Sequence, residues 1–256
     1  MKRYLATSLM CLIEKGYFGL SELFGQYVMR AAAMGALLMI WRALSLSGAD
    51  LGDMTLNQLY VYTVLSTALG PMLDVRTPAG GWLHDGTMLS LYLRPASVVG
   101  QLIAHTLGGW VLRLSLLSAP VLVVAALLGV DMRPAGWAFL PSLLLSVSQG
   151  FAVDLLFAAL MIRLRSLSWP VHSLRESLTA LLTGALIPFS VLPLQIGRWL
   201  EMSPLGTLAG APLALYTGLG NAGRLLAAQV LWNALLWPLA AWCFRRSRER
   251  MVSYGG

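Results

Sequence analysis

Residues 137–162 read WAFLPSLLLSVSQGFAVDLLFAALMI, and Asp154 is the only charged residue among them. About 20 apolar residues in a helix, each adding a rise of about 1.5 Å, cross the ~30 Å hydrocarbon core of a bilayer. A block of this length with a single charge therefore predicts a transmembrane helix from Trp137 to Ile162.

The composition of the whole chain agrees with this block. Hydrophobic residues make up 57% of the 256 residues and charged residues only 11%, against roughly 25% charged residues in an ordinary soluble domain. A soluble fold of this size needs more polar surface than the chain can supply. The sequence therefore predicts an all-α integral membrane protein.

Further apolar blocks resemble the one at residues 137–162, and together they predict six transmembrane helices. The expected spans are Glu22–Leu44, Thr55–Leu73, Gln101–Val130, Trp137–Ile162, Ser177–Ser190 and Leu225–Phe244. They form one transmembrane domain over residues 20–256.

Residues 1–19 have a different pattern. Leu5, Leu9 and Leu12 recur at helical spacing, and basic and acidic residues surround them. This pattern is typical of an amphipathic helix that lies in the cytoplasmic membrane interface. The alternative is a simple extension of the first span.

Lysine and arginine residues lie at the ends of the apolar blocks and not along one polar face, so the net charge of +7 does not indicate a nucleic-acid partner. Positively charged loops stay cytoplasmic, and the bias predicts cytoplasmic termini. The residues then on the inner side are Lys2, Arg3, Lys15, Arg76, Arg94, Arg163, Arg165, Arg175, Arg245, Arg246, Arg248 and Arg250, against Arg42, Arg133, Arg198 and Arg224 near the outer side.

Four prolines interrupt the apolar stretch between the fifth and sixth spans. Pro188, Pro193, Pro204 and Pro212 each remove a backbone donor, so no continuous helix fits this spacing. Broken backbone at membrane depth requires cover from protein or a water-filled cavity. We expect a hairpin of short helices that re-enters the membrane from the outer side; an ordinary outer loop is the alternative.

The motifs of enzymes are missing from the sequence. Residues 218–223 read GLGNAG, yet the dinucleotide-binding loop that they resemble needs a preceding strand and an acid about 20 residues later. Lys2 and Lys15 are the only lysines, and neither is followed by the Ser or Thr of a phosphate-binding loop. The three histidines lack the spacing of metal ligands. We therefore expect no catalytic residues, no metal and no bound cofactor in this chain.

Three charged residues, Arg30, Arg113 and Asp154, fall well inside the expected spans, together with Gln149. An unpaired charge at the centre of a bilayer costs at least ~3 kcal/mol, so such residues are paired or functional. Counted along their helices, Arg113 and Asp154 lie at similar depth and could form an ion pair. Two interpretations stay open: a structural pair between the third and fourth spans, or a polar lining of a translocation path.

Two stretches resemble a known family. Residues 85–95, DGTMLSLYLRP, are similar to the G-T…L-x-R-P segment that follows the second span in type-2 ATP-binding-cassette (ABC) exporter permeases. Residues 184–193, GALIPFSVLP, and 211–218, APLALYTG, resemble the outer hairpin of the same family. The pair His84-Asp85 departs from the aliphatic-acidic pair that the family carries before Gly-Thr.

The resemblance implies a permease subunit in a bacterial inner membrane, paired with a second permease that is identical or a sister chain. It also implies a separate ABC ATPase that binds ATP and magnesium. A coupling helix within Trp82–Pro95 would dock on that ATPase, with residues 163–176 as a second contact and the proline hairpin as an outer gate. The implied coupling residues are Asp85, Gly86, Thr87, Leu93, Arg94, Pro95, Arg165 and Arg175.

Two other functions compete with this interpretation. An ion-coupled secondary transporter or channel often has inverted repeats and acids near the midplane, but the first and last three spans show no repeat and Asp154 is the only acid near the middle of a span. A membrane scaffold would need no elaborate outer hairpin. The permease is therefore the expected function, surrounded by membrane lipid.

Overall fold

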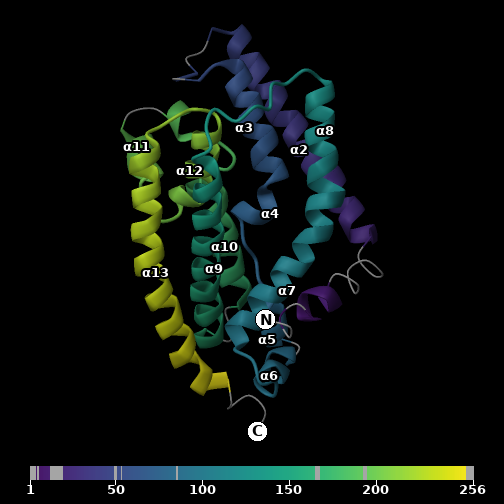
Figure 1. Ribbon diagram of the computed structural model, residues 1–256, viewed down its shortest axis with the longest axis vertical. Helices are drawn as coiled ribbons and strands as arrows, with labels where there is room; N and C mark the ends of the chain where they lie inside the picture. Colours follow the sequence, from purple (N-terminus) through teal and green to yellow (C-terminus); the bar gives the residue numbers. More distant parts are fainter. Residues whose placement is uncertain are drawn as a thin grey trace.

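A computed structural model describes residues 4, 6–11, 20–48, 51–52, 54–84, 86–164, 168–192 and 195–251 of the chain. Within these residues, every regular element is a helix and no β-strand occurs (Figure 1). The all-α fold that the apolar blocks predict is therefore confirmed for this part of the chain.

Four helical stretches are long and apolar enough to cross a membrane. They correspond to the first, third, fourth and sixth predicted spans. Helix α2 covers Leu20–Leu46, α9 covers Phe139–Arg163 and α13 covers Ala222–Met251. The fourth stretch, Val98–Leu127, combines α7, η1 and α8.

The second and fifth predicted spans are shorter helices. Helix α3 (Leu56–Ala68) is followed by α4 (Gly70–Leu73), where Pro71 interrupts the helical hydrogen bonds. Helix α10 (Ser168–Leu182) begins before the predicted Ser177 and ends eight residues before the predicted Ser190. At about 1.5 Å per residue, neither α3 nor α10 alone reaches across ~30 Å of hydrocarbon.

A π-turn interrupts the long stretch Val98–Leu127. Helix α7 (Val98–Arg113) passes into the π-turn η1 (Leu114–Ser118) and then into α8 (Ala119–Leu127). Pro120 follows the turn and has no amide hydrogen to donate to an earlier carbonyl, which favours a local change of hydrogen-bond pattern. The helix continues in the same general direction on both sides of the turn (Figure 1).

Helix α9 is the central element of the bundle. It packs along α13 and also contacts α12 (Gly206–Tyr216), α10 and α4. Helix α2 packs mainly against α3, where the Trp41 indole donates to the Thr63 hydroxyl at 3.0 Å. Most of the α2 surface is exposed and apolar, as expected of a helix that faces lipid.

Two short helices occupy one end of the bundle together with the last turns of α13 (Figure 1). Helix α5 covers Ala79–His84, and α6 covers Thr87–Tyr92. Their buried residues share a core with Ala240 and Phe244 of α13. The C-terminal end of α13 therefore lies on the same side of the molecule as α5 and α6.

Part of the predicted amphipathic helix is described, and residues 6–11 are helical. The Ser8 hydroxyl donates to the Ala104 carbonyl of α7 at 2.6 Å, and the Tyr4 ring lies against Gly100. Gly100, Ala104 and Gly108 follow one another at intervals of four residues, and such small residues let two helices approach closely. The rest of residues 1–19 lies outside the described part.

Three short elements connect α10 to α13. They are the 3₁₀ turn η3 (Phe189–Val191), helix α11 (Ile196–Glu201) and helix α12. The Tyr62 hydroxyl of α3 donates to the Gly184 carbonyl at 2.6 Å, and Ser66 donates to the Ala185 carbonyl at 2.5 Å. Side chains of α3 therefore satisfy the backbone where the chain leaves α10.

Candidate functional site

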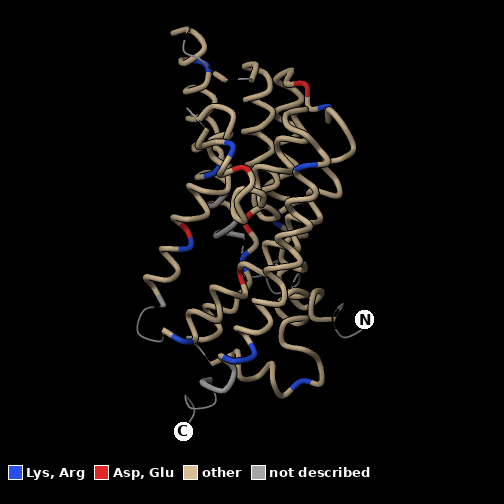
Figure 2. The backbone as a smooth tube through the Cα atoms, turned by 90° about the vertical axis from the view of Figure 1, so that its left-hand side faces the viewer, with Lys and Arg blue, Asp and Glu red and all other residues tan. Residues whose placement is uncertain are grey.

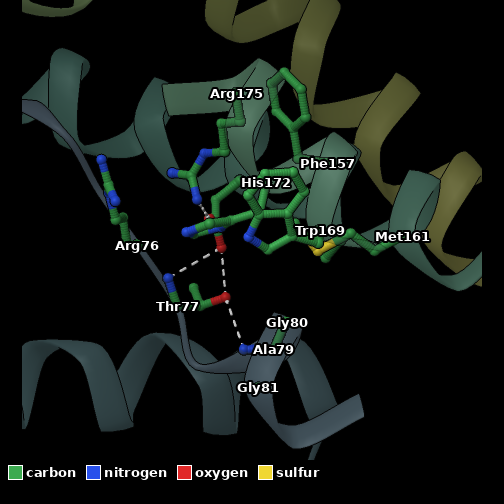
Figure 3. Close-up of a pocket in the computed structure, with 12 residues that line it drawn as sticks. Arg76, Thr77, Ala79, Gly80, Gly81, Phe157, Met161, Trp169, His172 and Arg175 are labelled. Atoms are coloured by element: carbon green, nitrogen blue, oxygen red, sulfur yellow. Dashed lines mark hydrogen bonds and ion pairs between the residues drawn. The ribbon is translucent and has the colours of Figure 1, made fainter. Parts of the chain in front are cut away.

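The candidate site is built around residues 74–78, the non-helical segment that links α4 to α5 (Figure 3). A polypeptide without helical hydrogen bonds exposes its backbone groups, and within a membrane protein other parts of the chain must satisfy them. Side chains from α9 and α10 supply these contacts. Charged residues of both signs lie in this middle part of the bundle, away from its two ends (Figure 2).

Asp154 of α9 holds the part of the segment next to α5. Its Oδ2 atom accepts a hydrogen bond from the Thr77 amide at 3.1 Å and another from the Thr77 hydroxyl. The same hydroxyl accepts from the Ala79 amide at 3.4 Å, at the first residue of α5 (Figure 3). One carboxylate of α9 thereby fixes the point at which α5 begins.

Arg175 of α10 is the ionic partner of Asp154. Its Nη1 atom lies 2.6 Å from Asp154 Oδ1, and its Nη2 atom donates to the Val75 carbonyl at 2.5 Å. Asp154 is 3% exposed and Arg175 is 6% exposed. Removing one partner of such a buried pair leaves an uncompensated charge, so the two residues stabilise each other strongly.

This geometry corrects two expectations from the sequence. Asp154 pairs with Arg175 and not with Arg113, because α10 packs directly against α9 and brings Arg175 to the carboxylate. Arg175 was also expected at the ATPase surface, but its guanidinium group is buried among α9, α10 and the segment 74–78. In this arrangement Arg175 does not reach a surface where another chain could bind it.

A second set of ion pairs lies at the edge of the site. Arg76 contacts Asp74 and Glu176 at 2.6 Å each, and His172 Nε2 lies 3.4 Å from Glu176 Oε1. Asp74 also lies 3.7 Å from Arg175 and so connects the outer pairs to the buried one. The whole arrangement, Asp74, Arg76, Thr77, Asp154, Arg175 and Glu176, is called the clamp below.

A cavity of about 430 Å³ adjoins the clamp, within the size range of small-molecule sites. Phe157 and Met161 of α9 form apolar walls, and Trp169 and His172 of α10 line it on another side (Figure 3). The Arg175 guanidinium group lies 6.0 Å from the centre of the Phe157 ring. The cavity therefore combines apolar walls with a charged end.

The segment resembling a coupling helix forms α5, α6 and the turn that follows. Gly86 has a φ of +75°, a left-handed conformation that glycine adopts without strain, and it starts α6. Met88 and Leu91 are buried, whereas Leu93 is 88% exposed and Arg94 and Pro95 are also exposed. Of the other expected coupling residues, Thr87 is exposed, and Asp85 and Arg165 lie outside the described residues.

The expected gate prolines have different surroundings. Pro188 precedes η3 and Pro212 lies inside α12, and both are buried. Pro204 is half-buried just before α12, and Pro193 lies outside the described residues. Among the described prolines of this set, Pro188 and Pro204 therefore lie between helical elements, and Pro212 lies within a helix.

Gln149 belongs to a buried polar network that holds α12. Its Nε2 atom donates to the Pro204 carbonyl at 2.5 Å and to the Thr207 hydroxyl at 3.0 Å. Gln229 of α13 donates to the Thr207 carbonyl at 2.9 Å. Ser146 of α9 donates to the Leu208 carbonyl, which lacks its usual helical donor because residue 212 is a proline. Side chains of α9 and α13 therefore replace missing backbone donors of α12.

Arg30 and Arg113 remain as two further charges of the expected spans. Arg30 lies on α2 and Arg113 at the end of α7, and both side chains are half-buried. The structure does not join either of them to Gln149 or Asp154 by a hydrogen bond or ion pair among the described residues.

Sequence reasoning missed most of the clamp. Asp74, Thr77 and Glu176 belong to no motif, and the sequence predicts Arg76 only as a cytoplasmic charge. A local signal did exist for the buried pair. Asp154 lies nine residues before the end of α9 and Arg175 seven residues after the start of α10, so a short connection brings both to similar depth.

The described part of the chain contains no group of three or more His, Cys, Asp or Glu side chains that could hold a metal ion. The polar side chains of the site instead form ion pairs with one another and hydrogen bonds to the backbone. The arrangement suits the mechanical linkage of helices and the binding of a molecule in a cavity.

Comparison with known proteins identifies the family. Residues 31–255 match the family described as ABC-2 family transporter protein, and the match runs from within α2 to beyond the end of α13. No curated protein matches the chain in sequence. The long apolar helices and the match over nearly the whole chain lead to one conclusion: the chain belongs to the ABC-2 transporter family and is a multi-pass membrane protein of the ABC transporter permease type.

Proposed function

We propose that this chain is the membrane-spanning subunit of an ABC exporter and that a separate ATPase subunit drives it through α5 and α6. The observation that carries the proposal is the exposed tip Leu93-Arg94-Pro95, which lies at the end of the segment resembling a coupling helix. A large exposed leucine beside an exposed arginine and a proline is a surface suited to another protein chain.

The clamp connects this tip to the interior of the helix bundle. Segment 74–78 comes directly before α5, and Asp154 and Arg175 hold it from α9 and α10. A displacement of α5 and α6 by an ATPase would therefore pull on α9 and α10, and not only on the adjoining loop. Packed helices respond to such a pull as rigid bodies.

The proposal includes a complete topology. Six membrane crossings, with α3–α4 and α10 as the two short ones, place both termini on the cytoplasmic side of a bacterial inner membrane. Residues 1–19 lie in the interface, and the elements from η3 to α12 form the re-entrant hairpin and outer gate. The buried polar network supports this, because it satisfies broken backbone as membrane depth requires.

In the assembled transporter, two permease subunits bind two ATPase subunits, and ATP and magnesium bind to the ATPases. This chain then performs no chemistry of its own and forms part of the translocation path. The second permease is another copy of this chain or a related one.

Purification in mild detergent from the native host tests the proposal. We expect an ABC ATPase to co-purify in near-equal amount and the complex to hydrolyse ATP. Arg94→Glu should release the ATPase or uncouple its activity, because the charge at the exposed tip is reversed. The matched control is Arg133→Glu. The Arg133 side chain is 92% exposed, and the residue is distant in sequence from this tip.

A chain that purifies alone, or as an oligomer without an ATPase, would refute the proposal. Ion-coupled transport would then be the leading function. An ATPase that binds equally well to the Arg94→Glu variant and keeps its normal activity in the complex would place the docking surface elsewhere.

A further inference from the structure

Arg30 and Arg113 stand apart from the ion pairs of the clamp. Both lie within apolar stretches that are long enough to cross a membrane, Tyr27–Leu46 and Val98–Leu127. Among the described residues, neither forms an ion pair, and the Arg113 Nε atom is buried without a hydrogen-bond partner. A charge left this way within a membrane is costly and marks a functional site.

Arg30 faces the interior of the chain. Tyr27 and Met34, three residues before it and four after it, lie on the same face of α2 and pack against a core formed by α3 and α8. The Arg30 Nη1 atom comes within 3.3 Å of the position that a Cβ atom on Gly70 would take. The missing side chain of Gly70 therefore leaves room for the guanidinium group beside α4.

Arg113 approaches the same region from α7. Trp110 of α7 and Leu114, the first residue of η1, pack in a core with Val75 and Met72. The π-turn η1, which follows Arg113, is hydrogen-bonded to α3, because the Ser118 hydroxyl donates to the Ala68 carbonyl at 2.5 Å. Arg113 thus lies close to the break between α3 and α4 that Arg30 faces from α2.

Electrostatics in this region favour a negative ligand. Arg30 lies within electrostatic range of Arg113, Arg76 and Asp74. The Asp74 carboxylate contacts Arg76 at 2.6 Å and Arg175 at 3.7 Å. Its negative charge is therefore already balanced by these two arginines and does not neutralise Arg30 or Arg113. Asp154 and Glu176 are also paired within the clamp, and four arginines therefore face three carboxylates.

We propose that Arg30 and Arg113 together bind the anionic headgroup, a phosphate or carboxylate, of an amphipathic molecule that the transporter carries. Guanidinium groups match the geometry of phosphate and carboxylate oxygens, and the orphaned Arg113 Nε–H is a donor in place for one of them. Tyr27, Trp110 and Leu114 supply apolar contacts beside the two charges. Anion binding at this site does not depend on the proposed function; only the role of the site in transport rests on it.

Two amphiphiles of opposite charge test the site. The protein, with any chains that co-purify, is placed in lipid discs of phosphatidylcholine and titrated with octyl phosphate or octyltrimethylammonium below their micellar concentrations. Binding is followed by intrinsic tryptophan fluorescence. We expect octyl phosphate to bind and its affinity to fall at least about tenfold in Arg30→Gln and in Arg113→Gln, since each loses a charged hydrogen bond.

The controls separate charge from fold. Arg113→Lys keeps the charge but loses the planar guanidinium group and its Nε–H, so its affinity should lie between those of the unchanged protein and Arg113→Gln. Arg133→Gln, at an exposed arginine, should bind like the unchanged protein. Equal binding of both amphiphiles by the unchanged protein would overturn the inference even if the glutamine variants failed to fold. Unchanged affinity in both glutamine variants would overturn it as well.

A further arm identifies the source of the headgroup. Phosphatidylglycerol in the discs will compete with octyl phosphate if a membrane lipid occupies the site. It will not compete if the site selects a more soluble amphiphile. Either result requires that octyl phosphate binds, and so either result supports the site. The binding measurement needs no ATP. An absent ATPase would therefore refute the proposed function alone, and an active ATPase without anion preference would refute this inference alone.

Discussion

At the scale of single residues, Asp154 shows how one carboxylate can join three elements. It lies on α9, pairs with Arg175 of α10 and accepts two hydrogen bonds from Thr77 ahead of α5. A buried carboxylate needs several such partners, because an isolated charge of this kind is too costly to remain ionised in an apolar interior. The same contacts that satisfy Asp154 therefore position the start of α5.

We expect Asp154→Asn to destabilise the protein by about 3–5 kcal/mol, because Arg175 remains buried without its counter-charge. The midpoint of thermal unfolding in detergent should fall clearly. Asp154→Leu combined with Arg175→Met removes both charges and should recover much of the loss. Asp131→Asn is the matched control, since its contact with Arg133 is 3.9 Å long and exposed; an equal loss in this control would contradict the assignment.

Glu176 provides a pH-dependent test of the outer pairs. The Arg76 guanidinium group lies 2.6 Å from the Glu176 carboxylate, so this pair contributes to stability while Glu176 is ionised and the contribution is lost as acid protonates the carboxylate. The difference in unfolding midpoint between the unchanged protein and Glu176→Gln should be small but measurable at pH 7 and should vanish in acid. A difference that grows on acidification would rule out the ion pair as its source.

At the scale of elements, the short helices depend on their neighbours more than on their own sequence. Helix α12 contains Pro212, which removes a helical hydrogen bond, and Ser146 of α9 donates to the carbonyl left free. Gln149 and Gln229 satisfy two other carbonyls near the start of α12. The helix thus persists through contacts that no local propensity could predict.

The N-terminal helix offers an element whose docking can be tested. A Cβ atom on Gly108 would collide with the backbone of Ser8, so Gly108→Ala should displace residues 6–11 from α7. Cys11, now 1% exposed, should then react faster with a maleimide in a Cys243→Ser background. Gly35→Ala is the control, because a Cβ there meets nothing within 4 Å.

The two glycine variants should also differ in stability. Alanine normally favours a helix over glycine by about 1 kcal/mol, so Gly35→Ala should be neutral or stabilising. Unchanged Cys11 labelling in Gly108→Ala would show that residues 6–11 do not depend on close contact with α7.

At the scale of the whole molecule, hydropathy predicts the long elements and fails where packing decides. The first predicted span, Glu22–Leu44, lies within α2, and the third, Gln101–Val130, is close to Val98–Leu127. Apolar length is a local property, so four of the spans could be found from sequence. The partner of Asp154 could not, because Arg113 and Arg175 are both at suitable depth and only the packing of α10 on α9 chooses between them.

The proposed topology predicts which exposed residues share a side of the membrane. In a background without Cys11 and Cys243, a cysteine at Leu93 should react with an impermeant maleimide only in inside-out vesicles. A cysteine at Arg133 should react only in right-side-out vesicles or intact cells. Both native side chains are largely exposed, at 88% for Leu93 and 92% for the side chain of Arg133. Labelling of both from one side would exclude the six-crossing arrangement.

The π-turn at Leu114–Ser118 has a consequence for how this chain tolerates insertions and deletions. The π-turn accommodates one residue more than a regular helical turn, so deleting one residue from it would leave α7 and α8 in nearly the same alignment. Each residue of a regular α-helix turns the chain by about 100°, so deleting one residue from α8 would rotate α7 relative to the rest of α8 by about that angle. Arg113 would then swing away from the region beside Gly70 even though no side chain had been replaced. The angular alignment of the two membrane arginines is therefore encoded by a count of backbone residues, and the loss of one residue should be far less tolerated in α8 than in the π-turn.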